Sequence, residues 1–154
     1  MRFTKYKIEL VKEDAVNYGG QDFNINNAWQ MYKAMCDIYH IDRQTEEVFY
    51  VVCVNTKNRI IGIHEVSRGI LDASLVSQRE LFKRVLLNNA AKIFIIHNHP
   101  SGVPTPSNAD FLVTNKVKKA GELLDISLLD HIIIGDNQYY SFKENGKLWG
   151  GHYG

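Results

Sequence analysis

Hydrophobic residues gather in short runs that are separated by polar and turn-forming residues. Such runs are typical of strands in a sheet with at least one buried face. The continuously apolar run at 93–96 is typical of a strand that is buried on both faces. The polar stretch 55–58 joins two runs and predicts a hairpin. We expect strands at 3–11, 47–54, 59–66, 93–96, 128–134 and 138–142.

Between these runs the hydrophobic residues recur at helical spacing. In the first such segment one stripe of the helix is expected to face the core, and it holds Trp29, Tyr32, Cys36 and Tyr39. The element order mixes hairpins with helical crossovers, which predicts the α/β class and a mixed-sheet α/β sandwich. We expect helices from Asn26 or Asn27 to about Tyr39, from Gln78 to Ala90 and from Asn108 to Leu124.

The length of 154 residues and the hydrophobic content of 45% suit one domain with a core of its own. We expect residues 26–145 to form this domain. Residues 1–25 would add an N-terminal strand and loop to the same unit, and residues 146–154 would form a Gly-rich tail.

Charge and hydropathy limit the partners of the chain. The net charge is +1, with 18 basic and 17 acidic residues, so no overall field attracts the protein to nucleic acid or to an anionic membrane. No apolar stretch is long enough to span a bilayer, and the first residues lack the apolar region of a signal peptide. We expect a cytoplasmic protein that does not associate with membranes, with Cys36 and Cys53 as reduced thiols. The oligomeric state is left open.

Two histidines follow the apolar run at 93–96, at the point where the predicted strand leaves the core. Side chains alternate between the two faces of a strand, so His97 and His99 point to the same face while Asn98 points away. Both imidazoles can therefore bind one cation, and Pro100 ends the strand.

The following loop and helix can bring a carboxylate to these histidines. Ser107 is a good N-cap, and it places Asp110 in the first turn of the helix. Two histidines and one aspartate, with a fourth position left to water, form a catalytic arrangement of Zn²⁺, because a structural site would be closed by a fourth protein ligand. We expect His97, His99 and Asp110 to be the zinc ligands, and the bound water would react near neutral pH.

The chain resembles a known family at four stretches: His97-Asn98-His99-Pro100-Ser101-Gly102, Pro106-Ser107-x-x-Asp110, Asn55-Thr56-Lys57-Asn58-Arg59 and Leu129-Asp130-His131. They resemble the JAMM (MPN-plus) metalloprotease motif, and more closely its RadC-like JAB domain branch. The likeness covers about residues 25 to 143. It implies a cytidine-deaminase-like layering of helices and sheet, and a zinc-dependent hydrolase that acts on a peptide or protein substrate at peptide or isopeptide bonds.

The resemblance also implies catalytic roles. A zinc-bound water needs a general base, and in the JAMM pattern this glutamate begins a buried strand upstream of the histidines. Glu47, followed by Val-Phe-Tyr-Val-Val, matches that pattern. Glu46 is the alternative in the adjacent register and would point to the opposite face, and Glu65 is the runner-up. Glu80 suits the first turn of a helix without catalysis.

Three further residues receive roles near the predicted site. By the resemblance, the hydroxyl of Ser107 would donate a hydrogen bond to the oxyanion of the tetrahedral intermediate, in addition to capping its helix. Asp130 and His131 are expected in supporting positions, because His131 as a fourth ligand would close the water position.

Two other functions remain open. The first is a nucleic-acid-binding protein or nuclease associated with DNA repair, a role that the near-neutral charge does not support. Full-length RadC proteins carry a helix-hairpin-helix segment before the catalytic domain, and residues 1–25 are too short for one. The second alternative is a non-catalytic, zinc-stabilised interaction domain.

Overall fold

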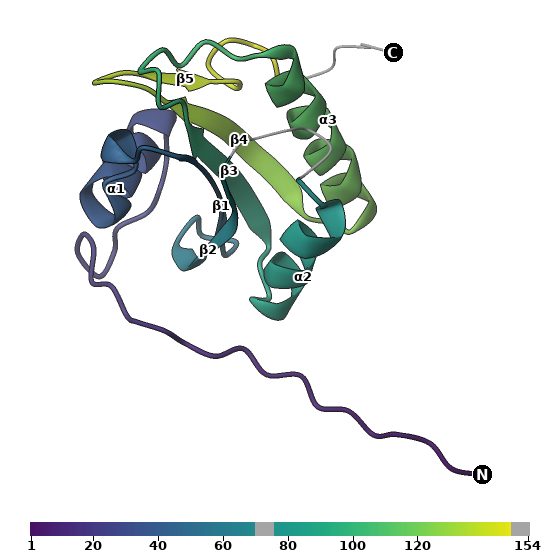
Figure 1. Ribbon diagram of the computed structural model, residues 1–154. Helices are drawn as coiled ribbons and strands as arrows, with labels where there is room; N and C mark the ends of the chain where they lie inside the picture. The colour runs from purple at the N-terminus through teal and green to yellow at the C-terminus, as the bar shows by residue number, and fades with distance from the viewer. Residues whose placement is uncertain (70–75, 149–154) are drawn as a thin grey trace.

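The computed structural model describes residues 1–69 and 76–148 of the chain (Figure 1). None of the helices in these ranges has the length and apolar character that a membrane crossing requires. The elements, in chain order, are α1 (Ala28–Tyr39), the short 3-10 helix η1 (Ile41–Arg43), β1 (Glu47–Val54), β2 (Ile60–Gly69), α2 (Gln78–Leu87), β3 (Lys92–Asn98), α3 (Asn108–Leu123), β4 (Ser127–Ile134) and β5 (Tyr139–Ser141).

The five strands form one sheet in the order β2-β1-β3-β4-β5. β1 is antiparallel to both of its neighbours, β3 and β4 are parallel, and β5 returns antiparallel to β4. Helix α1 covers one face of the sheet, whereas α2 and α3 cover the other (Figure 1). The predicted class, a mixed-sheet α/β sandwich, is confirmed.

The central strands are hydrophobic on both sides because both faces of the sheet are covered. In β1 every residue from Val48 to Val54 is buried. Phe49, Val51 and Cys53 belong to the core beneath α2 and α3, whereas the alternate residues belong to the core beneath α1. Cys53 is a buried free thiol and Cys36 a half-buried one. The period of two that predicted the strands thus divides the side chains between two cores.

The predicted strand at residues 3–11 is wrong. The segment forms no strand, and it extends away from the sheet (Figure 1). Phe3, Tyr6 and Ile8 are exposed. Alternation shows that a segment would suit a sheet, but a strand also needs a neighbour to accept its backbone hydrogen bonds.

The predicted core stripe of the first helix is displaced by one position. Trp29 is 55% exposed, whereas Ala28, Met31 and Met35 are buried. The buried positions follow the spacing i, i+3, i+7 from Ala28, as an amphipathic helix requires. The large aromatic residues led the sequence pattern to centre the buried face of the helix one position too far along. Tyr32 lies at the edge of the buried face and packs against Tyr139, with ring centroids 5.2 Å apart.

Two other predicted segments differ in extent. β2 continues to Gly69, past the predicted end of this strand at residue 66, and residues 70–75 lie outside the described residues. At the other end, Leu148 is only 3% exposed and belongs to the core beneath α2 and α3. The chain therefore packs as far as Leu148, and the remainder of the predicted tail lies outside the described residues.

Asp130 is a buried carboxylate that joins β4 to the turn after β5. Its Oδ1 accepts hydrogen bonds from the backbone N–H groups of His131 at 2.8 Å and Lys143 at 2.9 Å, and its Oδ2 accepts one from Ser141 Oγ at 2.5 Å. Burial raises the pKa of Asp130 to about 6 despite these donors. The carboxylate therefore acts as a structural clamp within this part of the fold.

We predict that Asp130→Ala lowers the free energy of unfolding by about 2–4 kcal/mol, since three hydrogen-bond donors, two of them buried, lose their acceptor. Asp130→Asn should cost less, because the amide oxygen still accepts from the backbone. Denaturant unfolding would measure both.

The same pair of proteins tests the ionisation of Asp130. The folded-state pKa of about 6 lies above the unfolded value. The folded wild type therefore binds a proton between about pH 4 and about pH 6 that the unfolded chain lacks. Its free energy of unfolding should fall, relative to that of Asp130→Asn, as pH rises through this window. Parallel pH profiles of the two proteins would contradict the assignment.

Candidate metal centre

The end of β3 places the two predicted histidine ligands. The strand stays paired with β4 beyond its last assigned residue, because His99 N donates to Ile134 O at 2.9 Å. A turn follows, in which Gly102 N donates to His99 O at 2.9 Å. This loop lies directly on the β4–β5 turn: a Cβ at Gly135 would lie 2.4 Å from Gly102 O, so only glycine fits there.

The first turn of α3 places the third predicted ligand. Ser107 Oγ accepts from Asp110 N at 3.2 Å, and Ser107 N donates to Asp110 Oδ2 at 2.7 Å. This reciprocal capping box holds the Asp110 side chain back over the helix N-terminus. Ser107 uses its oxygen as an acceptor in the cap, which leaves its hydroxyl proton available to a further acceptor.

The three predicted ligands lie together at the end of the sheet. His97 Nε2 is 3.1 Å from Asp110 Oδ1, and His99 Nε2 is 3.2 Å from Asp110 Oδ2. The two Nε2 atoms are 3.1 Å apart. His97 and Asp110 are buried, whereas the His99 side chain is 15% exposed. The cluster thus opens toward solvent on the side of His99.

The chemistry of this donor set fits a metal ion. His99 Nδ1 is 2.8 Å from Val103 O, and a carbonyl oxygen only accepts, so Nδ1 carries the proton and neutral His99 has its lone pair on Nε2. His97 Nδ1 likewise has a partner, His131 Nε2, at 2.9 Å. Two imidazole nitrogens and a carboxylate oxygen within 4.8 Å of one another could hold one metal ion.

The charges of the cluster are strongly coupled. Burial alone would raise the pKa of Asp110, but hydrogen bonds from His97 and His99, which form when their Nε2 atoms carry protons, outweigh it and hold that pKa well below its usual range. The Asp110 carboxylate in turn raises the pKa of His99. Full burial, followed by the effect of His97, lowers the pKa of His131 well below its ordinary value. These shifts favour an ionised Asp110 and a neutral His131.

The register of β1 determines which glutamate faces the histidines. Phe49 pairs with His97, and their rings stack with centroids 5.9 Å apart. Glu47 is two residues before Phe49 and so lies on the same face of the sheet. Its charge contributes to the raised pKa of His99, in agreement with that position.

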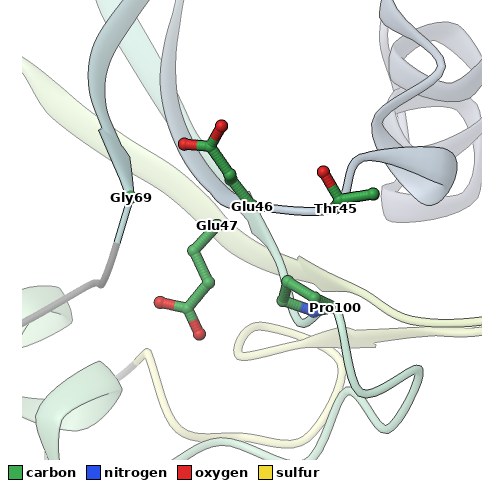
Figure 2. A pocket seen from close by; sticks show the side chains of 5 residues that line it. All are labelled: Thr45, Glu46, Glu47, Gly69 and Pro100. Carbon is green, nitrogen blue, oxygen red and sulfur yellow. The ribbon is translucent and has the colours of Figure 1, made fainter.

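Of the alternative glutamates, Glu46 lies beside Glu47, whereas Glu65 and Glu80 lie elsewhere. Glu46 and Glu47 both line a cavity of about 330 Å³, together with Thr45, Gly69 and Pro100, and their side chains leave the backbone in different directions (Figure 2). Glu65 pairs with Tyr50, on the face opposite to His97, and forms an ion pair with Arg68 at 2.6 Å. Glu80 is in the first turn of α2, paired with Lys83 and Arg84.

Asn98, between the two histidines, has a structural task that the sequence did not suggest. The pairing of β1 with β3 ends at Phe49 and His97, and beyond it the Asn98 side chain replaces the missing backbone partners. Its Oδ1 accepts from Val48 N at 2.8 Å, and its Nδ2 donates to Glu46 O at 2.9 Å. These bonds hold the backbone on both sides of Glu47.

Thr114 is a second residue that the sequence reasoning missed. It is buried in α3, four residues after Asp110, and its hydroxyl contacts both Asp110 O, at 2.7 Å, and His131 Nδ1, at 2.6 Å. The spacing i, i+4 places it on the same helix face as Asp110, and that was the signal available in the sequence. Asp130, by contrast, is adjacent to His131 in β4 and contacts Ser141 and Lys143.

An α/β fold with a five-stranded mixed sheet, three α-helices and a His-His-Asp cluster at a strand end is consistent with a JAB/MPN fold. The family model described as "RadC-like JAB domain" matches residues 25–147. The chain belongs to this family.

Relatives that carry the name UPF0758 protein support the assignment. One from Clostridium beijerinckii is 50% identical over 103 residues, which cover 67% of this chain and 45% of the relative. One from Desulfitobacterium hafniense is 47% identical over 74% of this chain and 49% of its own length. One from Thermotoga maritima is 38% identical over 80% of this chain and 54% of its own length. The chain thus spans about half the length of these relatives.

We predict that His99→Ala and Asp110→Ala each abolish stoichiometric metal binding, whereas the wild type binds one ion per chain. Elemental analysis after metal loading and desalting would measure this. His64→Ala is the matched control, because His64 lies in β2 outside the cluster and contacts Asn88. Retention of the ion by both ligand variants would contradict the site.

The affinity of the wild type for the metal ion should fall as pH is lowered through the raised pKa of His99, because protons compete with the ion for Nε2.

We predict that Asn98→Ala lowers the free energy of unfolding by about 2–4 kcal/mol, because Val48 N–H and Glu46 C=O both lose a buried partner. Exposed Asn108→Ala should stay within about 0.5 kcal/mol of the wild type. Hydrogen exchange at the Val48 amide should also accelerate in Asn98→Ala. An unchanged exchange rate there would show that the clamp is unimportant.

Proposed function

We propose that this domain is a zinc-dependent hydrolase of peptide or isopeptide bonds. The observation that carries the proposal is the meeting of His97 Nε2, His99 Nε2 and the Asp110 carboxylate at a strand end, on the sheet face that also holds Glu47. Nitrogen-rich sites with a single carboxylate favour zinc over magnesium or calcium, whose ligands are mainly oxygens. Three protein ligands, with one position left open, are typical of catalytic zinc.

Zinc at this site would acidify a water molecule and polarise the carbonyl group of the substrate. The cavity beside Glu47, lined by Thr45, Glu46, Gly69 and Pro100, is where a substrate chain would lie (Figure 2). Glu47 would accept the proton from the attacking water and return it to the leaving amine, the usual task of a carboxylate general base. The Asn98 clamp keeps its backbone in place for that transfer.

Ser107 would serve as the oxyanion donor. Its oxygen accepts the Asp110 N–H within the capping box, and its proton can point outward from the exposed side chain. A donor of this kind contributes about 2.7–4 kcal/mol to transition-state stabilisation, more than a helix cap, at about 1 kcal/mol, contributes to stability.

We predict that zinc-loaded wild type cleaves members of a peptide and isopeptide substrate library, and that Glu47→Gln retains zinc but loses about 10²- to 10⁴-fold in kcat/KM. Glu65→Gln is the matched control: the residue is on the opposite sheet face, so activity should persist. Product formation by mass spectrometry, together with zinc content, would measure both.

Three results would overturn the proposal in whole or in part. If zinc-loaded wild type cleaves no amide bond in the library, the domain is not the hydrolase proposed, and zinc binding without turnover would favour an interaction domain. If Glu65→Gln abolishes cleavage while Glu47→Gln does not, the roles of the two glutamates are reversed. Binding of DNA with a strong salt dependence would favour the nucleic-acid alternative.

A further inference from the structure

A buried chain of polar side chains lies directly beneath the metal ligands. It runs from His97 Nδ1 to His131 Nε2 at 2.9 Å, from His131 Nδ1 to Thr114 Oγ1 at 2.6 Å, and from Thr114 Oγ1 to Asp110 O at 2.7 Å. All four residues are at most 2% exposed. This hydrogen-bond chain therefore begins at one predicted ligand, His97, and ends on the backbone of another, Asp110.

The direction of each hydrogen bond follows from the last acceptor. Asp110 O is a carbonyl oxygen that can only accept, so the Thr114 hydroxyl donates its single proton to it. Thr114 Oγ1 must then accept from His131, which places a proton on His131 Nδ1. When His131 is neutral, its Nε2 has only a lone pair and accepts from His97 Nδ1–H. The Nε2 of neutral His97 is then unprotonated.

The surroundings of His131 favour its neutral form. The ring is fully buried and stacks on Phe142, with centroids 4.7 Å apart and planes within 6° of parallel. Phe49 packs against the ring edge to face, with ring centroids 6.1 Å apart. A positive charge on this ring would be poorly solvated and would oppose a metal cation held by His97. The two phenylalanines also fix the plane of the ring, so each nitrogen has one partner.

We propose that Thr114 and His131 are positioning residues that fix the tautomer of His97, so that Nε2 is always presented to the metal as a lone pair. The usual partner of a metal-binding histidine is a carboxylate or a backbone carbonyl, which can only accept. His131 can donate or accept, and it is Thr114 that restricts it to accepting. Thr114 thus decides which atom donates and which accepts in every bond of this hydrogen-bond chain.

Asp110 is linked to the same chain through its backbone. The bond from the Thr114 hydroxyl to the carbonyl four residues earlier is a common one for threonine in a helix. Here the carbonyl belongs to a ligand, so the helix that positions the Asp110 carboxylate also sets the tautomer of His97. Valine has nearly the shape of threonine but no hydroxyl, and Thr114→Val would remove only the direction-setting group.

The test compares wild type, Thr114→Ser and Thr114→Val. The proposal rests on the metal site of the proposed hydrolase, but its first measurement needs neither metal nor substrate. With ¹⁵N-labelled histidine, long-range ¹H–¹⁵N spectra of the metal-free protein at about pH 8, where free histidine is neutral, identify the protonated nitrogen of each ring. We expect the His131 proton on Nδ1 in wild type and Thr114→Ser, and a shift of the proton toward Nε2 in Thr114→Val.

Zinc affinity, measured by competition with a chelator, is the second readout. Thr114→Val should bind zinc about 10- to 100-fold more weakly, as is typical when the partner of a ligating histidine is disturbed, and Thr114→Ser should retain wild-type affinity. Thermal unfolding would show whether Thr114→Val is folded. If it is not, the spectra of wild type and Thr114→Ser still decide the tautomer.

The possible failures are distinguishable. A His131 proton on Nε2 in the wild type overturns the inference whatever the activity of the domain. Unchanged zinc affinity in folded Thr114→Val also overturns it, while the proposed hydrolase stands. If the tautomers and affinities are as expected but no amide bond is cleaved, the positioning role holds and the hydrolase proposal fails.

Discussion

The register between β3 and β4 is the constraint on which the site depends. Ile93 pairs with Leu128, but Phe94 pairs with Asp130, so the ladder skips one residue of β4. Because successive side chains alternate between faces, this single irregularity exchanges the orientations of Asp130 and His131. His131 then faces the same core as His97. Without the irregularity, a carboxylate rather than an imidazole would lie on that face.

The way in which β3 separates from β1 completes the site. Pairing with β4 continues to the end of β3, whereas pairing with β1 stops at His97. The gap is bridged by the Asn98 side chain instead of by backbone, and beside it lies the cavity next to Glu47. The end of β3 thus provides His97 and His99 on one face. Through Asn98 it also holds the backbone around Glu47, at the start of β1, next to these histidines.

Hydrogen bonds among the buried polar groups of the site offset the cost of their burial. His97, Asp110, Thr114 and His131 are all buried, and the side chain of each has at least one hydrogen-bond partner. A partly satisfied network of this kind would cost several kcal/mol, because unpaired polar groups are poorly tolerated in a low-dielectric core. The same hydrogen bonds hold the rings of His97 and His131 in their orientations.

Local patterns in the sequence were sufficient to predict the fold class and the placement of the three candidate metal ligands. Alternation in a strand is sufficient to place His97 and His99 on one face, and the capping box at Ser107 is sufficient to bring Asp110 over the start of its helix. Both relations span only a few residues, so they need no knowledge of the tertiary fold. The β-rich runs and helical spacings predicted the α/β class for the same reason.

Only the tertiary structure decided the features that depend on pairing between distant segments. Alternation could not show that residues 3–11 lack a neighbouring strand, or that Trp29 faces outward while Met31 is buried. Nor could the sequence decide which of Glu47 and Glu65 shares the face of His97, because that depends on non-local strand register. The contact of Thr114 with His131 joins residues 17 positions apart through the packing of α3 on β4. Strand register and helix packing are set by the whole core, and no single segment of the sequence contains them.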